Sequence, residues 1–201
     1  MSVLWEQFVL TFIPLFIVID AIGTLPFVIS LSEGMNRKER RHMINIAVLT
    51  AAVVGLVFLF FGQFVLTVMG ISFASFAVAG GIVLLVLSIR HMSTGQMTED
   101  IAKEEVMAMV PIGTPLSAGP ATITTLILLV QQYPLYVVLI SFLLNVIILW
   151  IIFLLGNWIS GFLGRGGLKA VSRVFSLLLA AIAISMIFKG LNMAGIISLT
   201  Q

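Results

Sequence analysis

The chain has 201 residues, of which 61% are hydrophobic and 9% are charged, and its mean hydropathy is +1.24. Soluble domains carry about 25% charged residues, so this composition indicates an integral membrane protein and leaves no length for a soluble catalytic domain. The absence of cysteine excludes disulfides, thiol nucleophiles and cysteine-based metal sites. The basic pI of about 9.3 does not indicate a nucleic-acid partner, because the basic residues gather at the ends of apolar segments.

Six apolar segments are long enough to cross a bilayer, which takes about 20 helical residues. They account for most of the sequence and predict an all-α integral membrane protein with six transmembrane helices. In chain order the segments are Phe8–Ser30, Ile44–Phe64, Ile71–Ile89, Val106–Val130, Leu135–Ile159 and Phe175–Met193.

The distribution of Lys and Arg predicts the orientation of these helices. Of the ten basic residues, all but Lys189 lie in or beside the loops after the first, third and fifth segments. The positive-inside rule places those loops in the cytoplasm and both termini outside. The Arg37–Arg41 cluster is interpreted as this topology signal rather than as a specific lipid site. Asn36, directly before the cluster, is a predicted helix N-cap.

The first segment carries residues that an anchoring helix would not need. Pro14, Gly23 and Pro26 disfavour a continuous helix, and Asp20 places a carboxylate at membrane depth. Broken backbone is tolerated within a membrane where it lines a protein cavity. The segment is therefore predicted to be a broken helix at a functional site.

The fourth segment repeats this irregularity, with three of the chain's six prolines. We expect a helix that ends near Ser117, an unwound Ala118–Gly119, and a second half-helix that starts at Pro120, the favoured first position. The amides of Ala121, Thr122 and Ile123 would then lack intrahelical acceptors. Such a half-helix N-terminus attracts a carboxylate or another anionic group.

An internal repeat connects the two irregular segments. At one offset of 94, Gly62 pairs with Gly156 and Gly70 pairs with Gly164, although chance similarity of apolar segments remains the alternative. Residues 1–98 and 99–201 would each hold three helices. An odd number inverts the second copy, so the fold is predicted as two inverted three-helix repeats with discontinuous helices 1 and 4.

Two motifs resemble those of a known family. The string D-A-I-G-T-L-P-F from Asp20 is similar to D-P-x-G-N-x-P-x-F, and the string P-L-S-A-G-P-A-T-I-T-T from Pro115 is similar to P-L-x-A-G-P-G-x-I-T-T. These are signatures of the MarC family of six-span prokaryotic inner-membrane proteins, which includes SnatA-type small neutral amino acid transporters. The chain departs from the pattern at Ala21, Thr24 and Ala121.

The resemblance implies a substrate site between the two broken helices. Amides of Ala121 and Thr122 suit the carboxylate of an amino acid, while Asp20 or carbonyls near Gly23 suit its ammonium group. Gly23 and Gly119 would let backbone approach a small ligand. The full set of expected site residues is Asp20, Gly23, Thr24, Pro26, Gly119, Pro120, Ala121, Thr122 and Thr125.

Two other interpretations of Asp20 stay open. Its carboxyl group could carry a proton, since desolvation favours the neutral form. It could also be structural, held by neighbouring backbone amides or by Asn145.

The predicted function is secondary transport of a small neutral amino acid, such as glycine or alanine, across the prokaryotic inner membrane by alternating access. An exporter or channel for another small solute, or a membrane scaffold, is the alternative. An intramembrane enzyme is disfavoured, because the segments hold no cysteine, histidine or paired acids placed for catalysis. We expect no cofactor and no nucleic-acid partner, and we expect the protein to lie in a lipid bilayer. The coupling ion could be H⁺ or Na⁺, and the protein could form a homo-oligomer.

Overall fold

Helices dominate the part of the chain that the computed structural model describes, residues 2–94 and 119–197. The prediction of an all-helical chain is confirmed for these residues. In chain order the helices are α1 Ser2–Ile19, α2 Leu25–Leu31, α3 Arg37–Val68, α4 Phe73–Thr94, α6 Pro120–Gln132, α7 Leu135–Leu154 and α8 Gly156–Met193.

Four helical stretches among the described residues are long and apolar enough to cross a membrane, judged by length and composition. They are Arg37–Val68, Phe73–Arg90, Leu135–Leu154 and Gly166–Met193. The apolar stretches Val3–Ile19 of α1 and Ala121–Gln132 of α6 are shorter. The expected first half of the fourth segment, Val106–Ser117, lies outside the described residues.

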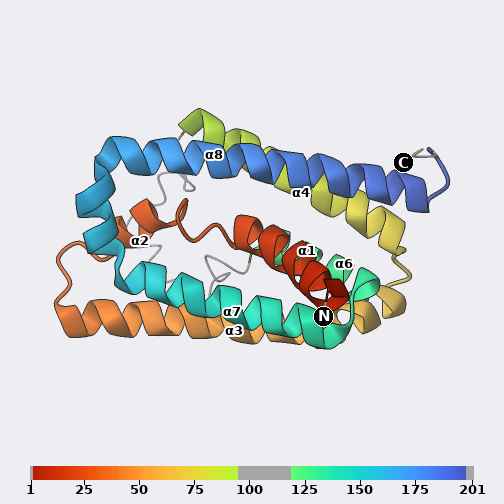
Figure 1. The fold of residues 1–201 in the computed structure, drawn as a ribbon, viewed down its shortest axis with the longest axis horizontal. Helices are drawn as coiled ribbons and strands as arrows, with labels where there is room; N and C mark the ends of the chain where they lie inside the picture. The colour runs from red at the N-terminus through yellow and green to blue at the C-terminus, as the bar shows by residue number, and fades with distance from the viewer. Residues whose placement is uncertain (1, 95–118, 198–201) are drawn as a thin grey trace.

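The short helices lie between two pairs of long ones (Figure 1). On one side α3 runs beside α7, and on the other side α4 runs beside α8, where the chain makes its most extensive helix contact. Between them, α1 contacts α6, α7 and α8, while α6 also contacts α3 and α4. The break of the first helix and Ala121 in the first turn of α6 are therefore buried within the protein.

Small residues allow the long helices to approach closely. A Cβ on Gly81 of α4 would lie 2.8 Å from the carbonyl oxygen of Ala183 on α8, and a Cβ on Gly190 of α8 would lie 2.8 Å from the carbonyl oxygen of Ala74 on α4. Gly55 of α3 similarly makes room for the ring of Phe142 on α7. Close backbone contact at small residues is typical of membrane helix pairs.

The predicted N-cap at Asn36 is confirmed. Its side-chain oxygen accepts the N–H groups of Lys38 and Glu39 at 2.9 and 3.0 Å, and the Glu39 carboxylate accepts the N–H of Asn36 at 2.9 Å. This capping box starts α3 within the basic cluster. The helix therefore begins one residue after Asn36, earlier than the apolar segment predicted from Ile44.

The expected end of the fifth segment at Ile159 is wrong. Helix α7 ends at Leu154, and Gly156 begins α8, which bends at Gly164 with φ 64° and ψ 174°. Gly156 lies against α2, since a Cβ there would be 2.8 Å from Cδ1 of Leu25. Packing against a helix from the other end of the sequence thus sets this boundary.

Candidate functional site

The first apolar segment is broken at Asp20, as predicted. Helix α1 runs through Pro14 to Ile19, and residues 20–24 form a turn before α2 begins at Leu25. Asp20 has φ 45°, which places a non-glycine residue in the left-handed region that aspartate tolerates better than most. Its side chain is 1% exposed. A carboxyl group is therefore buried at the break.

Backbone and side-chain hydrogen bonds hold the turn together. Oδ1 of Asp20 accepts the N–H of Gly23 at 3.0 Å, and the carbonyl oxygen of Asp20 accepts the N–H of Thr24 at 3.0 Å. The Thr24 hydroxyl donates to the carbonyl oxygens of Asp20 and Ala21 at 2.9 and 3.3 Å. Thr24 is fully buried and Pro26 follows in the first turn of α2. These contacts make the break an ordered turn.

The glycine at position 23 is required by this turn. A Cβ at Gly23 would overlap Oδ2 of Asp20 and lie 2.6 Å from its Cγ. The space that the missing side chain leaves is filled by the carboxyl group of Asp20. Gly23 was expected to let a small ligand approach the backbone. In this structure the carboxyl group of Asp20 occupies that space instead.

The half-helix predicted after the second break begins at the residue expected from the sequence. Helix α6 starts at Pro120, with Gly119 as N-cap in an extended conformation and without a capping side chain. The expectation of an unpartnered amide at Ile123 is wrong, because its N–H donates to the carbonyl oxygen of Gly119 at 3.2 Å and closes the first α-helical turn. The amide of Ala121 therefore has no acceptor within the helix.

Two threonines on α6 are buried close to this helix start. Thr122 is 1% exposed and Thr125 is 4% exposed. The Thr125 hydroxyl is buried and has no hydrogen-bond partner among the residues that the structure describes. Buried hydroxyls without a partner are uncommon, so Thr125 is a candidate for contact with a ligand or water.

The break of the first helix lies near the start of α6. Ile17 and Val18, just before the break, share a buried apolar cluster with Ala121 in the first turn of α6. A second buried cluster joins Ala21 and Leu25, on either side of the break, to Leu126 on α6. The structure thus brings the Asp20–Pro26 set and the Gly119–Thr125 set to the same region of the protein interior.

Asn145 is not the partner of Asp20. Its amide nitrogen donates to the carbonyl oxygens of Phe12 and Ser141 at 3.3 and 2.8 Å, at the interface of α1 and α7. One turn away, the hydroxyls of Thr11 and Ser141 are hydrogen-bonded at 2.7 Å. The sequence analysis missed Thr11 and Ser141, although isolated hydroxyl residues within apolar helices commonly bond across helix pairs.

The described residues contain no group of three or more His, Cys, Asp or Glu side chains that would suit a metal ion. The chemistry available near the break is therefore hydrogen bonding, one buried carboxyl group and the helix dipole.

Comparison with known proteins decides the family. The family model described as "MarC family integral membrane protein" matches residues 5–195. The chain belongs to the MarC family. The resemblance seen in the two motifs is confirmed at this level, and the protein is a multi-pass membrane protein.

Relatives of this MarC protein occur in archaea and bacteria. "UPF0056 membrane protein MJ1677" of Methanocaldococcus jannaschii is 31% identical over 199 residues, which cover 93% of this chain and 97% of that protein. "UPF0056 membrane protein PYRAB13050" of Pyrococcus abyssi is 30% identical, with 93% and 95% covered. "UPF0056 membrane protein YhcE" of Escherichia coli K12 is 29% identical, with 90% of each covered. No solved structure matches this MarC protein.

Proposed function

We propose that this MarC protein is a SnatA-type secondary transporter that carries a small neutral amino acid, such as glycine or alanine, by alternating access. The observation that carries the proposal is the buried carboxyl group of Asp20 in a broken helix beside the start of α6. Discontinuous helices with free backbone groups form the substrate sites of many secondary transporters.

The start of α6 supplies the groups that recognise the carboxylate of the substrate. The N-terminus of this helix carries the positive end of its dipole, and the Ala121 amide lacks an intrahelical acceptor. The unpartnered hydroxyl of Thr125 lies one turn further along the same helix and adds a donor. A carboxylate held here would satisfy both groups.

The break of the first helix supplies the acceptor for the ammonium group. A carboxylate accepts hydrogen bonds from N–H groups, as Oδ1 of Asp20 does from the N–H of Gly23, so it suits an ammonium donor. Substrate and carboxylate would then form a charge-assisted hydrogen bond. Because Asp20 and Thr24 are buried in the protein interior, a site here favours solutes with small side chains.

Reciprocal packing supports the two inverted repeats, residues 1–98 and 99–201. Gly62, in the first repeat, makes room for Ile127 on α6, while its counterpart Gly156, in the second repeat, makes room for Leu25 on α2. The second pair of aligned glycines, Gly70 and Gly164, has φ angles of 67° and 64°. One aligned pair thus contacts the short helices of the opposite repeat, and the other pair shares a positive φ.

The proposal includes an inner-membrane location with both termini outside, a coupling ion that is H⁺ or Na⁺, and no enzymatic activity. Asp20 is the group through which a proton would be coupled, because it is the buried acid at the break. The bacterial and archaeal origin of the relatives fits a prokaryotic membrane.

Counterflow in proteoliposomes tests the proposal. Vesicles loaded with unlabelled alanine should accumulate labelled alanine and glycine, and Asp20→Asn should abolish this exchange. Glu6→Gln is the matched control, since it makes the same chemical change at an exposed acid near the start of α1.

The control variant should exchange alanine as well as the parent protein. Exchange that survives in Asp20→Asn would remove Asp20 from the substrate site. Failure of the parent to exchange any of the twenty amino acids would refute amino acid transport.

A further inference from the structure

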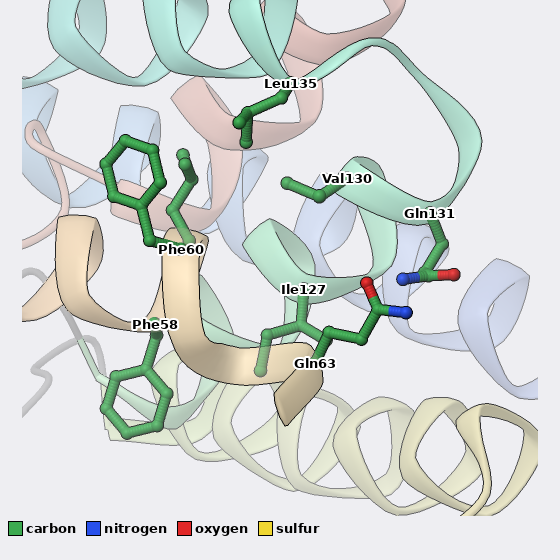
Figure 2. Close-up of a pocket in the computed structure, with 8 residues that line it drawn as sticks. Phe58, Phe60, Gln63, Ile127, Val130, Gln131 and Leu135 are labelled. Carbon is green, nitrogen blue, oxygen red and sulfur yellow. The ribbon is translucent and has the colours of Figure 1, made fainter. Parts of the chain in front are cut away.

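A cavity lies between α3, the C-terminal half of α6 and the start of α7, and none of the proposed substrate-site residues lines it. Its volume is about 170 Å³, and its wall is formed by apolar side chains that include Leu59, Phe60, Ile127 and Val130. Figure 2 shows the amides of two glutamines, Gln63 and Gln131, on one side of this cavity, away from the aromatic rings. None of the described residues that line it is charged. The cavity is therefore apolar with a polar, uncharged edge.

The cavity opens toward the bilayer. Phe60 belongs to a continuous exposed stripe on α3 that includes Val53, Val57 and Phe64, spaced as one helix face. In a multi-pass membrane protein such an exposed apolar stripe faces lipid. Leu135, on the α7 side of the cavity, is also exposed.

The glutamines lie at the level of the membrane interface. Gln63 is five residues before the end of α3, roughly 8 Å along the helix axis. Figure 1 places the start of α1, the end of α3 and the start of α7 at the same end of the molecule. The exposed aromatic residues at this end, Trp5, Phe64 and Tyr136, are typical of an aromatic belt. At this depth the ester groups of lipids meet their acyl chains.

We infer that this cavity seats one acyl chain of a bilayer phospholipid, with its ester region hydrogen-bonded to Gln63 and Gln131. The apolar wall suits the chain, and the two amides supply donors to ester carbonyls. Because the lining is uncharged, the site should not discriminate between zwitterionic and anionic headgroups. This role is independent of the transported solute.

Lipid retention tests the inference. Val130→Trp fills the cavity, and Val57→Trp places the same side chain on the lipid-facing stripe outside it. The purified proteins are delipidated in detergent, mixed with palmitoyl-oleoyl phosphatidylethanolamine or phosphatidylglycerol, and examined by native mass spectrometry. We expect the parent and Val57→Trp to retain one tightly bound molecule of either lipid, and Val130→Trp to lose it.

Equal retention by Val130→Trp and Val57→Trp would overturn the inference. If Val130→Trp does not fold, Leu135→Trp fills the cavity from the α7 side and serves the same purpose. If the protein retained only the anionic lipid, the inference that an uncharged site accepts both headgroups would also be wrong.

Spin labels distinguish a lipid-filled cavity from an aqueous vestibule. The chain has no cysteine, so Val130→Cys, Val57→Cys and Ser72→Cys can each be labelled at one site in nanodiscs. A label at position 130 should collide with oxygen as one at position 57 does. A label at Ser72→Cys, exposed between α3 and α4, should collide mainly with a water-soluble nickel complex. The same behaviour at position 130 would overturn the inference.

Discussion

The N–H of Gly23 donates to Oδ1 of Asp20 at 3.0 Å, and the carboxyl group of Asp20 occupies the space where a side chain at position 23 would begin. The two residues therefore depend on each other. The glycine lets the carboxyl group fold back on the turn, and the carboxyl group fixes the turn that interrupts the helix.

Gly23→Ala should displace the Asp20 carboxyl group and lower both transport and stability. The added methyl overlaps Oδ2 of Asp20, and overpacking of this kind costs about 1–3 kcal/mol. Thermal unfolding in detergent and alanine counterflow measure the two effects. Gly161→Ala is the control, because nothing lies within 4 Å of its added Cβ. An active and stable Gly23→Ala protein would show that the contact is dispensable.

Thr125→Val and Thr11→Val should have opposite effects. The Thr125 hydroxyl has no partner, so its removal should leave the melting temperature unchanged or raise it, while the apparent KM for alanine increases. The Thr11 hydroxyl is bonded to Ser141 at 2.7 Å, so its removal should cost about 1 kcal/mol. Loss of stability in Thr125→Val with an unchanged KM would assign this hydroxyl a structural role.

Gly62→Ala should be destabilising in a way that Ile127→Ala relieves. A Cβ at Gly62 would lie 2.5 Å from Cγ1 and 2.7 Å from Cδ1 of Ile127, and both atoms are absent from alanine. The double mutant should show a coupling energy of about 0.5–3 kcal/mol in a thermodynamic cycle. Additive effects of the two substitutions would mean that α3 and α6 do not pack through this pair.

Cysteine labelling should show that the C-terminal end and the first polar turn lie on opposite sides of the membrane. Ile196 and Glu33 are both exposed, and the parent has no cysteine. In intact cells a membrane-impermeant maleimide should label Ile196→Cys, and it should label Glu33→Cys only after permeabilisation. The reverse pattern would invert the orientation that the positive-inside rule predicts.

Local backbone structure was predictable from the sequence where a few neighbouring residues determine it. The break at Asp20 and the helix start at Pro120 follow from backbone preferences, and the cap at Asn36 follows from its spacing to Glu39. Helix boundaries that depend on distant contacts were not predictable. The end of α7 at Leu154 reflects the packing of Gly156 on Leu25, which hydropathy does not reveal.

The interior of the site was only partly predictable, because its contacts join residues that are distant in the sequence. The composition of the two motifs identified Thr125 as a candidate, but only the packed structure shows that its hydroxyl is buried without a partner. The hydroxyl pair of Thr11 and Ser141 was invisible in the sequence, because 130 residues separate the two.

This separation has a consequence for biosynthesis. Helix α1 enters the membrane first, yet its hydrogen-bonding partners on α7 emerge from the ribosome 130 residues later. Until then the turn at Asp20, which is buried in the folded protein, must be shielded from lipid by water, by the insertion machinery or by a chaperone. Truncation between the two repeats should therefore leave an inserted but incompletely folded N-terminal half, a natural substrate for membrane quality-control proteases.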